Sequence, residues 1–123
     1  MQKAKARAVA PSCPQKPALA ARPLITPKQA AGLEAMFKVL ASGTRLRLLH
    51  ALTRADELCV SDLAEAVSMT PQAVSNQLQR LADRGILASR RDGFYIHYRI
   101  VDPCVTSILD LGLCLTEDSE RRS

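Results

Sequence analysis

Residues 57–85 have the sequence ELCVSDLAEAVSMTPQAVSNQLQRLADRG, and this stretch decides the fold. Ser61 can cap a short helix over residues 62–67. After a tight turn, Thr70 is followed by proline, which is typical of the start of a second helix that ends near Asp83. The apolar positions of this second helix recur at helical spacing and are Val74, Leu78 and Leu81. Two short helices joined by a tight turn indicate a helix-turn-helix.

A β-hairpin is predicted directly after this pair of helices. Residues 86–91 form the first strand, Asp92 and Gly93 the turn, and residues 94–100 the second strand. The second strand alternates between an apolar face and a polar face: Phe94, Ile96, Tyr98 and Ile100 against Tyr95, His97 and Arg99. A hairpin in this place is a wing, so the predicted fold class is mainly α with a β-hairpin wing (α+β), a winged helix-turn-helix.

Helices are also predicted on both sides of this unit. Thr26 can cap a first helix that runs to about Ala41, and a second helix covers residues 44–53. Asp102 can cap a last helix that runs to about Thr116. This last helix is too apolar to stand alone on a small chain, and pairing with its copy across a two-fold axis is the simplest solution. We therefore expect a homodimer through the first and last helices.

The composition fits one domain with an aliphatic core. Of the 123 residues, 47% are hydrophobic but only 3% are aromatic, and there is no tryptophan. No apolar run approaches the roughly 20 residues of a membrane helix, so we expect no membrane partner and a cytoplasmic location. We expect a disordered basic arm over residues 1–25, the DNA-binding and dimerisation domain over 26–118, and a frayed tail over 119–123.

The charges are distributed unevenly along the chain, whose net charge is +5. Residues 1–22 carry basic side chains and no acidic ones, whereas the rest of the chain is neutral overall. Within that rest, residues 70–99 are rich in arginine and residues 102–120 carry only acids. One face can therefore meet a polyanion while the C-terminal segment faces elsewhere.

The second helix of the helix-turn-helix offers side chains suited to reading DNA. Glutamine and asparagine can pair bidentately with adenine, and arginine with guanine, whereas wing side chains suit phosphates or the minor groove. The candidates on the helix are Gln72, Ser75, Asn76 and Gln77 first, then Gln79 and Arg80, and those on the wing are Arg90, Arg91 and His97. The alternative for each is an ordinary solvated polar side chain. The expected partner is double-stranded operator DNA.

Four stretches in this order resemble the ArsR/SmtB family of dimeric transcriptional repressors. The resemblance covers about residues 27–118, and the stretches that carry it are residues 37–49, 57–64, 70–78 and 91–100. It implies a homodimeric winged helix-turn-helix whose metal-free form binds an operator and is released by a metal or another thiol-reactive input. It also implies no enzyme, and the chain shows no Cys/His pair at a plausible site, no glycine-rich phosphate loop and no paired carboxylates in a cleft pattern.

Four cysteines could supply the sensing site, and Cys59 stands nearest the DNA-reading unit. Its place just before a helix N-terminus favours the thiolate, which is the metal-binding form. Relatives often have Cys-Val-Cys at this point, but here the second position is Ser61, so Cys59 needs another thiol. Cys13 in the arm is the obvious additional donor.

The last helix offers a second candidate site. Other members of the family bind metal there, and the matching positions are Asp102 and Cys104, with Asp118 further along. Cys104 and Cys114 are about 15 Å apart along a helix and cannot bind one ion within a chain. In an antiparallel pair of helices, however, Cys104 of one chain could approach Cys114 of the other.

The ligand follows from the softness and number of the donors. Only two histidines exist and neither lies on the last helix, which disfavours a histidine-rich Zn, Ni or Co site. Thiolates select soft ions. Hg(II) is content with two thiolates, whereas the other soft ions usually want three or more. With few thiols for each plausible site, Hg(II) is our first choice, followed by Cd(II), Pb(II) or As(III). The alternatives are a thiol redox or persulfide-sensing repressor and a metal-free architectural DNA-binding dimer.

Overall fold

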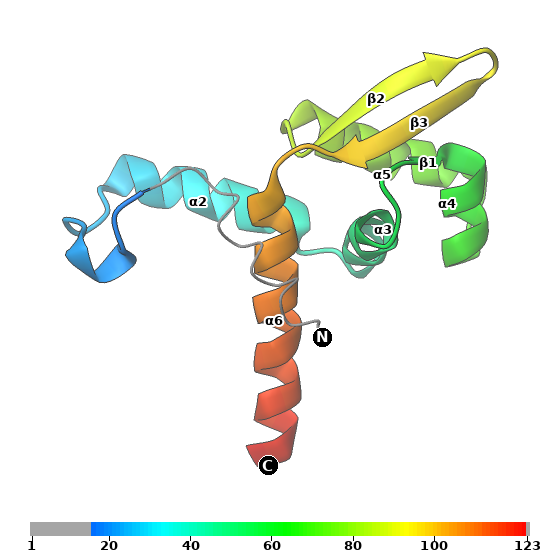
Figure 1. Cartoon of the computed structure of the whole chain (residues 1–123). Coiled ribbons are helices and arrows are strands. Elements are labelled where there is room, and N and C mark those ends of the chain that lie inside the picture. The colour runs from blue at the N-terminus through cyan, green and yellow to red at the C-terminus, as the bar shows by residue number, and fades with distance from the viewer. Residues whose placement is uncertain (1–15, 123) are drawn as a thin grey trace.

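The computed structural model describes residues 16–122 and has the predicted architecture, mainly helical with a β-hairpin wing (Figure 1). A short 3-10 helix η2 (Leu19–Ala21) precedes the domain. The helices are α2 (Pro27–Leu40), α3 (Gly43–Thr53), α4 (Val60–Val67), α5 (Pro71–Asp83) and α6 (Pro103–Arg122). The strands are β1 (Leu58–Cys59), β2 (Leu87–Asp92) and β3 (Tyr95–Ile100). Helices α4 and α5 form the helix-turn-helix, and β2 and β3 form the wing.

The start of α5 follows the sequence prediction, whereas the start of α4 does not. The Thr70 hydroxyl accepts a hydrogen bond from the amide of Ala73, which is the predicted N-cap of α5. Helix α4 begins at Val60, so its N-cap is Cys59, and the predicted Ser61 cap is wrong. The reason is β1, which holds Cys59 extended against β3 until the helix begins. The chain leaves α4 through Ser68, whose φ of 56° reverses its direction.

The wing turn lies one residue later than predicted. Asp92 still pairs with Tyr95 across the hairpin, so the turn residues are Gly93 and Phe94. Gly93 has a φ of 66°, which suits the first central position of a type II′ turn. Phe94 is therefore at the tip of the wing and 98% exposed, and its predicted place on the apolar face of the hairpin is wrong.

The sheet has a third strand that the sequence did not reveal. Its order is β1-β3-β2, with Leu58 opposite Tyr98 and Cys59 opposite His97. This pairing attaches the wing to the residues that lead into α4. The base of the wing is held on two sides, because β3 pairs with both β1 and β2 at His97 and Tyr98.

An aliphatic core holds the three central helices and the base of the wing together. The largest fully buried side chains are Leu48 and Leu49 of α3, Leu63 of α4, Val74, Leu78 and Leu81 of α5, and Ile86 before β2. Tyr98 also belongs to the core, and its burial raises the pKa of its hydroxyl. The predicted inward positions of α5 are confirmed, and they fix which face of that helix is left for a ligand.

Helices α2 and α6 extend away from this core, as Figure 1 shows. The amide of Cys104 donates to Asp102 at 2.9 Å, so the predicted start of α6 is confirmed. The helix continues to Arg122, beyond its predicted end near Thr116 and through part of the tail that we expected to fray. Both helices leave large apolar side chains exposed: Leu33 and Phe37 on α2, and Leu111, Leu113 and Leu115 on α6. Across residues 16–122, none of the helices has the length and apolar character to cross a membrane.

Candidate DNA-binding surface and thiol sites

The outer face of α5 carries most of the side chains that we expected to read DNA. Gln72 donates to Asn76 at 3.2 Å on the exposed side of the helix. Gln79 and Arg80 are also exposed, and Gln79 donates to Asp83 at 3.0 Å. These contacts order the side chains without burying them. The face opposite the core is therefore polar and accessible.

A groove runs between the start of α5 and the tip of the wing. It encloses about 350 Å³, and its walls are Cys59, Val60 and Ser61 before and in α4, Pro71, Gln72 and Ser75 of α5, and Phe94, Tyr95 and Ile96 of the wing. The groove brings Cys59, a predicted metal ligand, onto one surface with Gln72 and Ser75, which are predicted to read bases. Cys59 itself is buried, and its thiol lies 3.2 Å from the Ser61 hydroxyl.

Gln77 differs from the other candidates on α5. It is half-buried, and its Oε1 accepts a hydrogen bond of 2.7 Å from Nη1 of Arg45 on α3. Its amide is directed toward the protein, not toward the open face of the helix. The sequence pattern placed Gln77 among the first base-reading residues and gave no sign of Arg45, which lies far away in the chain.

Arg90 is also engaged within the chain. Its guanidinium donates three hydrogen bonds of 2.7–3.1 Å to the carboxylate of Glu57, just before β1. This ion pair lowers the pKa of Glu57, chiefly through the hydrogen bonds from Arg90. Arg91 lies exposed on the wing, and His97 is half-buried there. The Glu57–Arg90 pair ties β2 to the strand on the other side of β3.

Acid is expected to loosen the wing through Glu57. The folded-state pKa of Glu57 is below its ordinary value of 4.5, so its stabilising contribution is complete above pH 4.5 and is lost as the pH falls through the lower folded value. Glu57→Gln removes the charge and should flatten this acid limb of the stability curve. Urea unfolding of both proteins between pH 7 and pH 3, followed by circular dichroism, measures the difference.

Glu34→Gln is the control for this experiment, because Glu34 makes one contact of 3.4 Å with Lys38 on the exposed surface of α2. Its acid limb should match that of the wild type. Parallel curves for the wild type and Glu57→Gln would show that the Glu57–Arg90 pair does not stabilise the fold.

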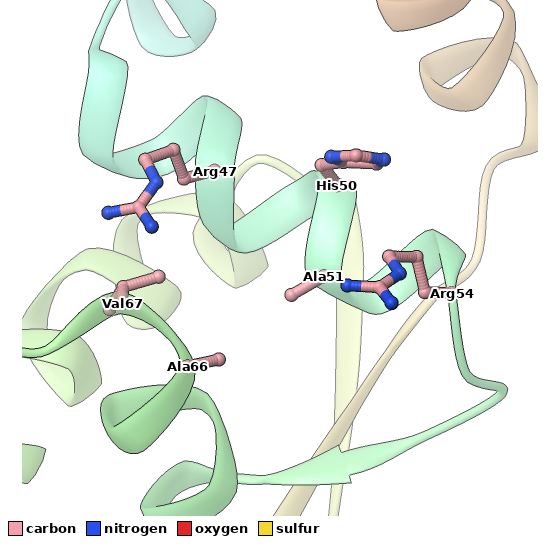
Figure 2. A pocket seen from close by; sticks show the side chains of 6 residues that line it. All are labelled: Arg47, His50, Ala51, Arg54, Ala66 and Val67. Atoms are coloured by element: carbon pink, nitrogen blue, oxygen red, sulfur yellow. The ribbon is translucent and has the colours of Figure 1, made fainter.

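A smaller pocket of about 130 Å³ lies between α3 and α4 (Figure 2). Its walls include three exposed side chains, Arg47 and His50 of α3 and Arg54 at the C-cap of that helix. His50 and Arg54 stand at the carboxyl end of α3, and Ala66 and Val67 are the last residues of α4. Cations at helix carboxyl ends complement the helix dipole. The charge of Arg54 is thus explained by its place at the end of α3, and the groove beside α5 is the better candidate interface.

The thiols occupy different surroundings. Cys59 is buried beside α4, whereas Cys114 is exposed on α6 with its sulfur 3.8 Å from Oδ2 of Asp118. Cys104 is half-buried in the first turn of α6 and is disulfide-bonded. Cys13 lies outside the described residues. Among residues 16–119, no three His, Cys, Asp or Glu side chains of one chain gather in a way that could hold a metal ion.

Comparison with known proteins identifies the chain. The family model described as "Bacterial regulatory protein, arsR family" matches residues 42–89. The cadmium resistance transcriptional regulatory protein CadC of Listeria innocua is 33% identical over 82 residues, which are 67% of this chain and 69% of CadC. The chain belongs to the ArsR family of bacterial regulatory proteins. It is therefore a transcriptional regulator and not an enzyme, in agreement with the sequence prediction.

Two solved structures extend this ArsR-family comparison. The AntR antimony-specific transcriptional repressor is 63% identical, with a TM-score of 0.76 over 89% of this chain and 98% of AntR. A homodimeric winged helix-turn-helix DNA-binding domain from Mycobacterium bovis is 28% identical, with a TM-score of 0.68 over 83% of this chain and 96% of that domain. The predicted winged helix-turn-helix is confirmed.

Proposed function

We propose that this chain is a homodimeric repressor that binds operator DNA and releases it when a soft metal or metalloid ion binds thiolates of α6. The observation that carries the proposal is the 63% identity to the AntR antimony-specific transcriptional repressor across nearly the whole described domain. The geometry of the chain supports each part of the proposal separately.

The exposed apolar faces of α2 and α6 support the dimer. Leu111 is 69% exposed and Phe37 49% exposed, although both lie on well-formed helices. Burying such side chains stabilises an assembly by about 25 cal/mol for each Å² of apolar surface removed from water. A two-fold pair would cover these faces, and the similar domain from Mycobacterium bovis is described as homodimeric.

The outer face of α5 and the wing support DNA binding. Gln72 and Asn76 are exposed near the start of α5, where a recognition helix contacts base edges. Arg80 and Arg91 are exposed and can contact phosphates. In this arrangement the groove between α5 and the wing would lie against the DNA.

The effector site would combine α6 of the two chains. Within residues 16–119 of one chain no three possible metal ligands gather, and a second chain or the arm that contains Cys13 would supply the further thiols. Cys114 is exposed with Asp118 beside it. In an antiparallel pair, Cys104 of the second chain would approach Cys114 and Asp118 of the first. Two equivalent sites would follow from the symmetry.

The comparison changes the order of the candidate ions. Two thiolates alone favour Hg(II), which was our first choice from the sequence. AntR is described as antimony-specific, and trivalent antimony and arsenic are soft ions of the same group. We therefore place antimonite first and arsenite next, with Hg(II), Cd(II) and Pb(II) after them. Asp118 or a thiol of the arm would then supply the third donor.

Release would be a shift between two arrangements of the dimer. One arrangement fits the operator and the other does not. The ion lowers the affinity for DNA only if it binds the second arrangement more tightly than the first. A bond between the two α6 helices would alter the spacing of the two reading surfaces. The coupling belongs to the dimer and not to a single chain.

A thiol redox switch on the same fold is the second candidate. The observation that favours it is the disulfide at Cys104. Cys59 is less suited to this role, because it is buried against Ser61. Oxidation of Cys104 would remove a ligand from the proposed ion site, so the two inputs would compete.

One titration separates these functions. A duplex is selected from a randomised library by the fully reduced wild-type chain, and binding is followed by fluorescence anisotropy while antimonite, arsenite, Hg(II), Cd(II), Pb(II), Zn(II) or peroxide is added. Release by antimonite at the lowest concentration is expected. Release by peroxide alone would favour the redox switch, and binding that no addition changes would leave a metal-free architectural dimer.

A further inference from the structure

We infer that Arg45 is a positioning residue, which holds the recognition helix α5 against the end of α2 through Gln77. The inference rests on the proposed function in one respect only: α5 must be the helix that reads DNA. Under this inference Gln77 positions α5 and does not read bases. Helix α2 is then connected to the DNA-binding surface through Arg45 and Gln77.

The geometry consists of three hydrogen bonds made by one residue. The Arg45 amide donates to Oγ of Ser42 at 3.3 Å, which places Arg45 in the first turn of α3. Its Nε donates to the carbonyl oxygen of Val39 at 2.6 Å, and its Nη1 donates to Oε1 of Gln77 at 2.7 Å. One half-buried guanidinium thus joins three helices.

The position of Arg45 in its own helix is electrostatically unfavourable. A cation in the first turn meets the positive end of the helix dipole. The carbonyl of Val39, by contrast, is among the last four of α2, which lack partners within the helix and form its negative end. The first turn of α3 does not itself favour a cation. The contacts that Arg45 makes with α2 and α5 therefore account for an arginine at this position.

The same contact removes Gln77 from base reading. A bidentate pair with adenine needs both the oxygen and the nitrogen of the amide directed at the base edge. The Gln77 oxygen is instead directed at Arg45, and the side chain is half-buried. Gln72 and Asn76 pair with each other on the exposed face of α5 and stay available. Gln77 thus sets where α5 stands, and its neighbours read the bases.

The arrangement also links the proposed dimer surface to the DNA-binding surface. Helix α2 carries the exposed Leu33 and Phe37, which we assign to the dimer contact. Its last turn is bonded to Arg45, and Arg45 is bonded to α5. A displacement of α2 within the dimer would therefore reach α5 through two hydrogen bonds of a single side chain.

The test uses Arg45→Met, Gln77→Ala and the double variant, with Arg47→Met as the matched control on the exposed side of α3. The first readout is hydrogen exchange of the α5 backbone in the free protein, which needs no DNA. The second is affinity and base preference for duplexes selected by the wild type. Arg45→Lys keeps the charge and serves if Arg45→Met does not fold.

Faster hydrogen exchange of the α5 backbone is expected for Arg45→Met and Gln77→Ala. For Arg47→Met the exchange rate should be that of the wild type. Affinity should fall about tenfold for either single variant, equally across duplexes with single base changes, because a hydrogen bond to a charged group is lost. The double variant should bind no more weakly than Gln77→Ala alone, because both changes remove the same contact.

Two results would overturn the inference. One is a change of base preference at a single position in Gln77→Ala but not in Arg45→Met, which would make Gln77 a base reader. The other is unchanged exchange of α5 in both Arg45→Met and Arg45→Lys. If the wild type selects no duplex, the proposed function fails, and the exchange of α5 alone then decides whether Arg45 positions the helix.

Discussion

Replacing Cys114 by serine is expected to leave operator binding intact and to abolish its release by antimonite. Serine keeps the size of the side chain but lacks the soft thiolate that such ions select. Cys114 is exposed on α6, which extends away from the core and the wing (Figure 1), so DNA contacts should persist. In the wild type the ion should weaken binding by about 5- to 150-fold, the usual range of coupling between two sites. Anisotropy titrations of reduced protein measure both quantities.

Cys104→Ser should behave in the same way, and Cys59→Ser is the control. Cys59 is buried beside α4, so its variant should still respond to the ion. A normal response in Cys104→Ser and Cys114→Ser together with a lost response in Cys59→Ser would move the site to the start of α4. That result would contradict the proposed site on α6.

Mixed dimers test whether the site crosses the two-fold axis. A dimer of one Cys104→Ser chain and one Cys114→Ser chain has an intact Cys114 in the first and an intact Cys104 in the second. If each site joins Cys104 of one chain to Cys114 of the other, this dimer regains one complete site and part of the response. A site built within one chain would regain nothing, so a silent mixed dimer would refute the crossed geometry.

The elements that could be predicted from the sequence are those with local signals. Thr70 before a proline marks the start of α5, and Asp102 marks the start of α6, because a capping side chain bonds an amide two or three residues away. Strand β1 has only two residues and exists because β3 lies beside it. A strand this short has no periodicity to detect, and its presence moved the N-cap of α4 from Ser61 to Cys59.

The candidate DNA-binding residues also divide into those that local spacing predicts and those whose contacts depend on distant residues. Gln72 and Asn76 lie on the exposed face of α5, as helical spacing predicts. Gln77 and Arg90 have suitable side chains for DNA, but each is bonded to a residue more than thirty positions away, Arg45 and Glu57. The sequence pattern shows residue types and spacing, and such long-range partners follow only from the packing of the helices and the wing.

The proposed thiol site depends on quaternary structure. Cys104 and Cys114 lie on one helix, as the sequence predicted, and they are too far apart along it to share an ion. Asp118 beside Cys114 fits the helical spacing of four residues. The proposed site needs Cys104 of one chain to meet Cys114 of the other, so it depends on how the two chains pair.

Two leucine-to-alanine substitutions are expected to separate the stability of the chain from that of the dimer. Leu78 on α5 has no exposed surface, so Leu78→Ala should lower the free energy of unfolding by about 2–5 kcal/mol. That is a large part of the roughly 5–15 kcal/mol typical of a domain. Its melting temperature should be low at every protein concentration, and α5 should lose its fixed position.

Leu111→Ala makes the same chemical change on α6, where the side chain is 69% exposed in the single chain. The fold of each chain should be unaffected, but the dimer loses a buried contact. By mass action its melting temperature should fall more steeply on dilution than that of the wild type. Circular dichroism melts over a range of concentrations, with sedimentation to measure the dimer, give both results. A Leu111→Ala variant that stays as dimeric as the wild type would mean that the chains pair through another surface, and the proposed site between Cys104 and Cys114 would lose its geometric basis.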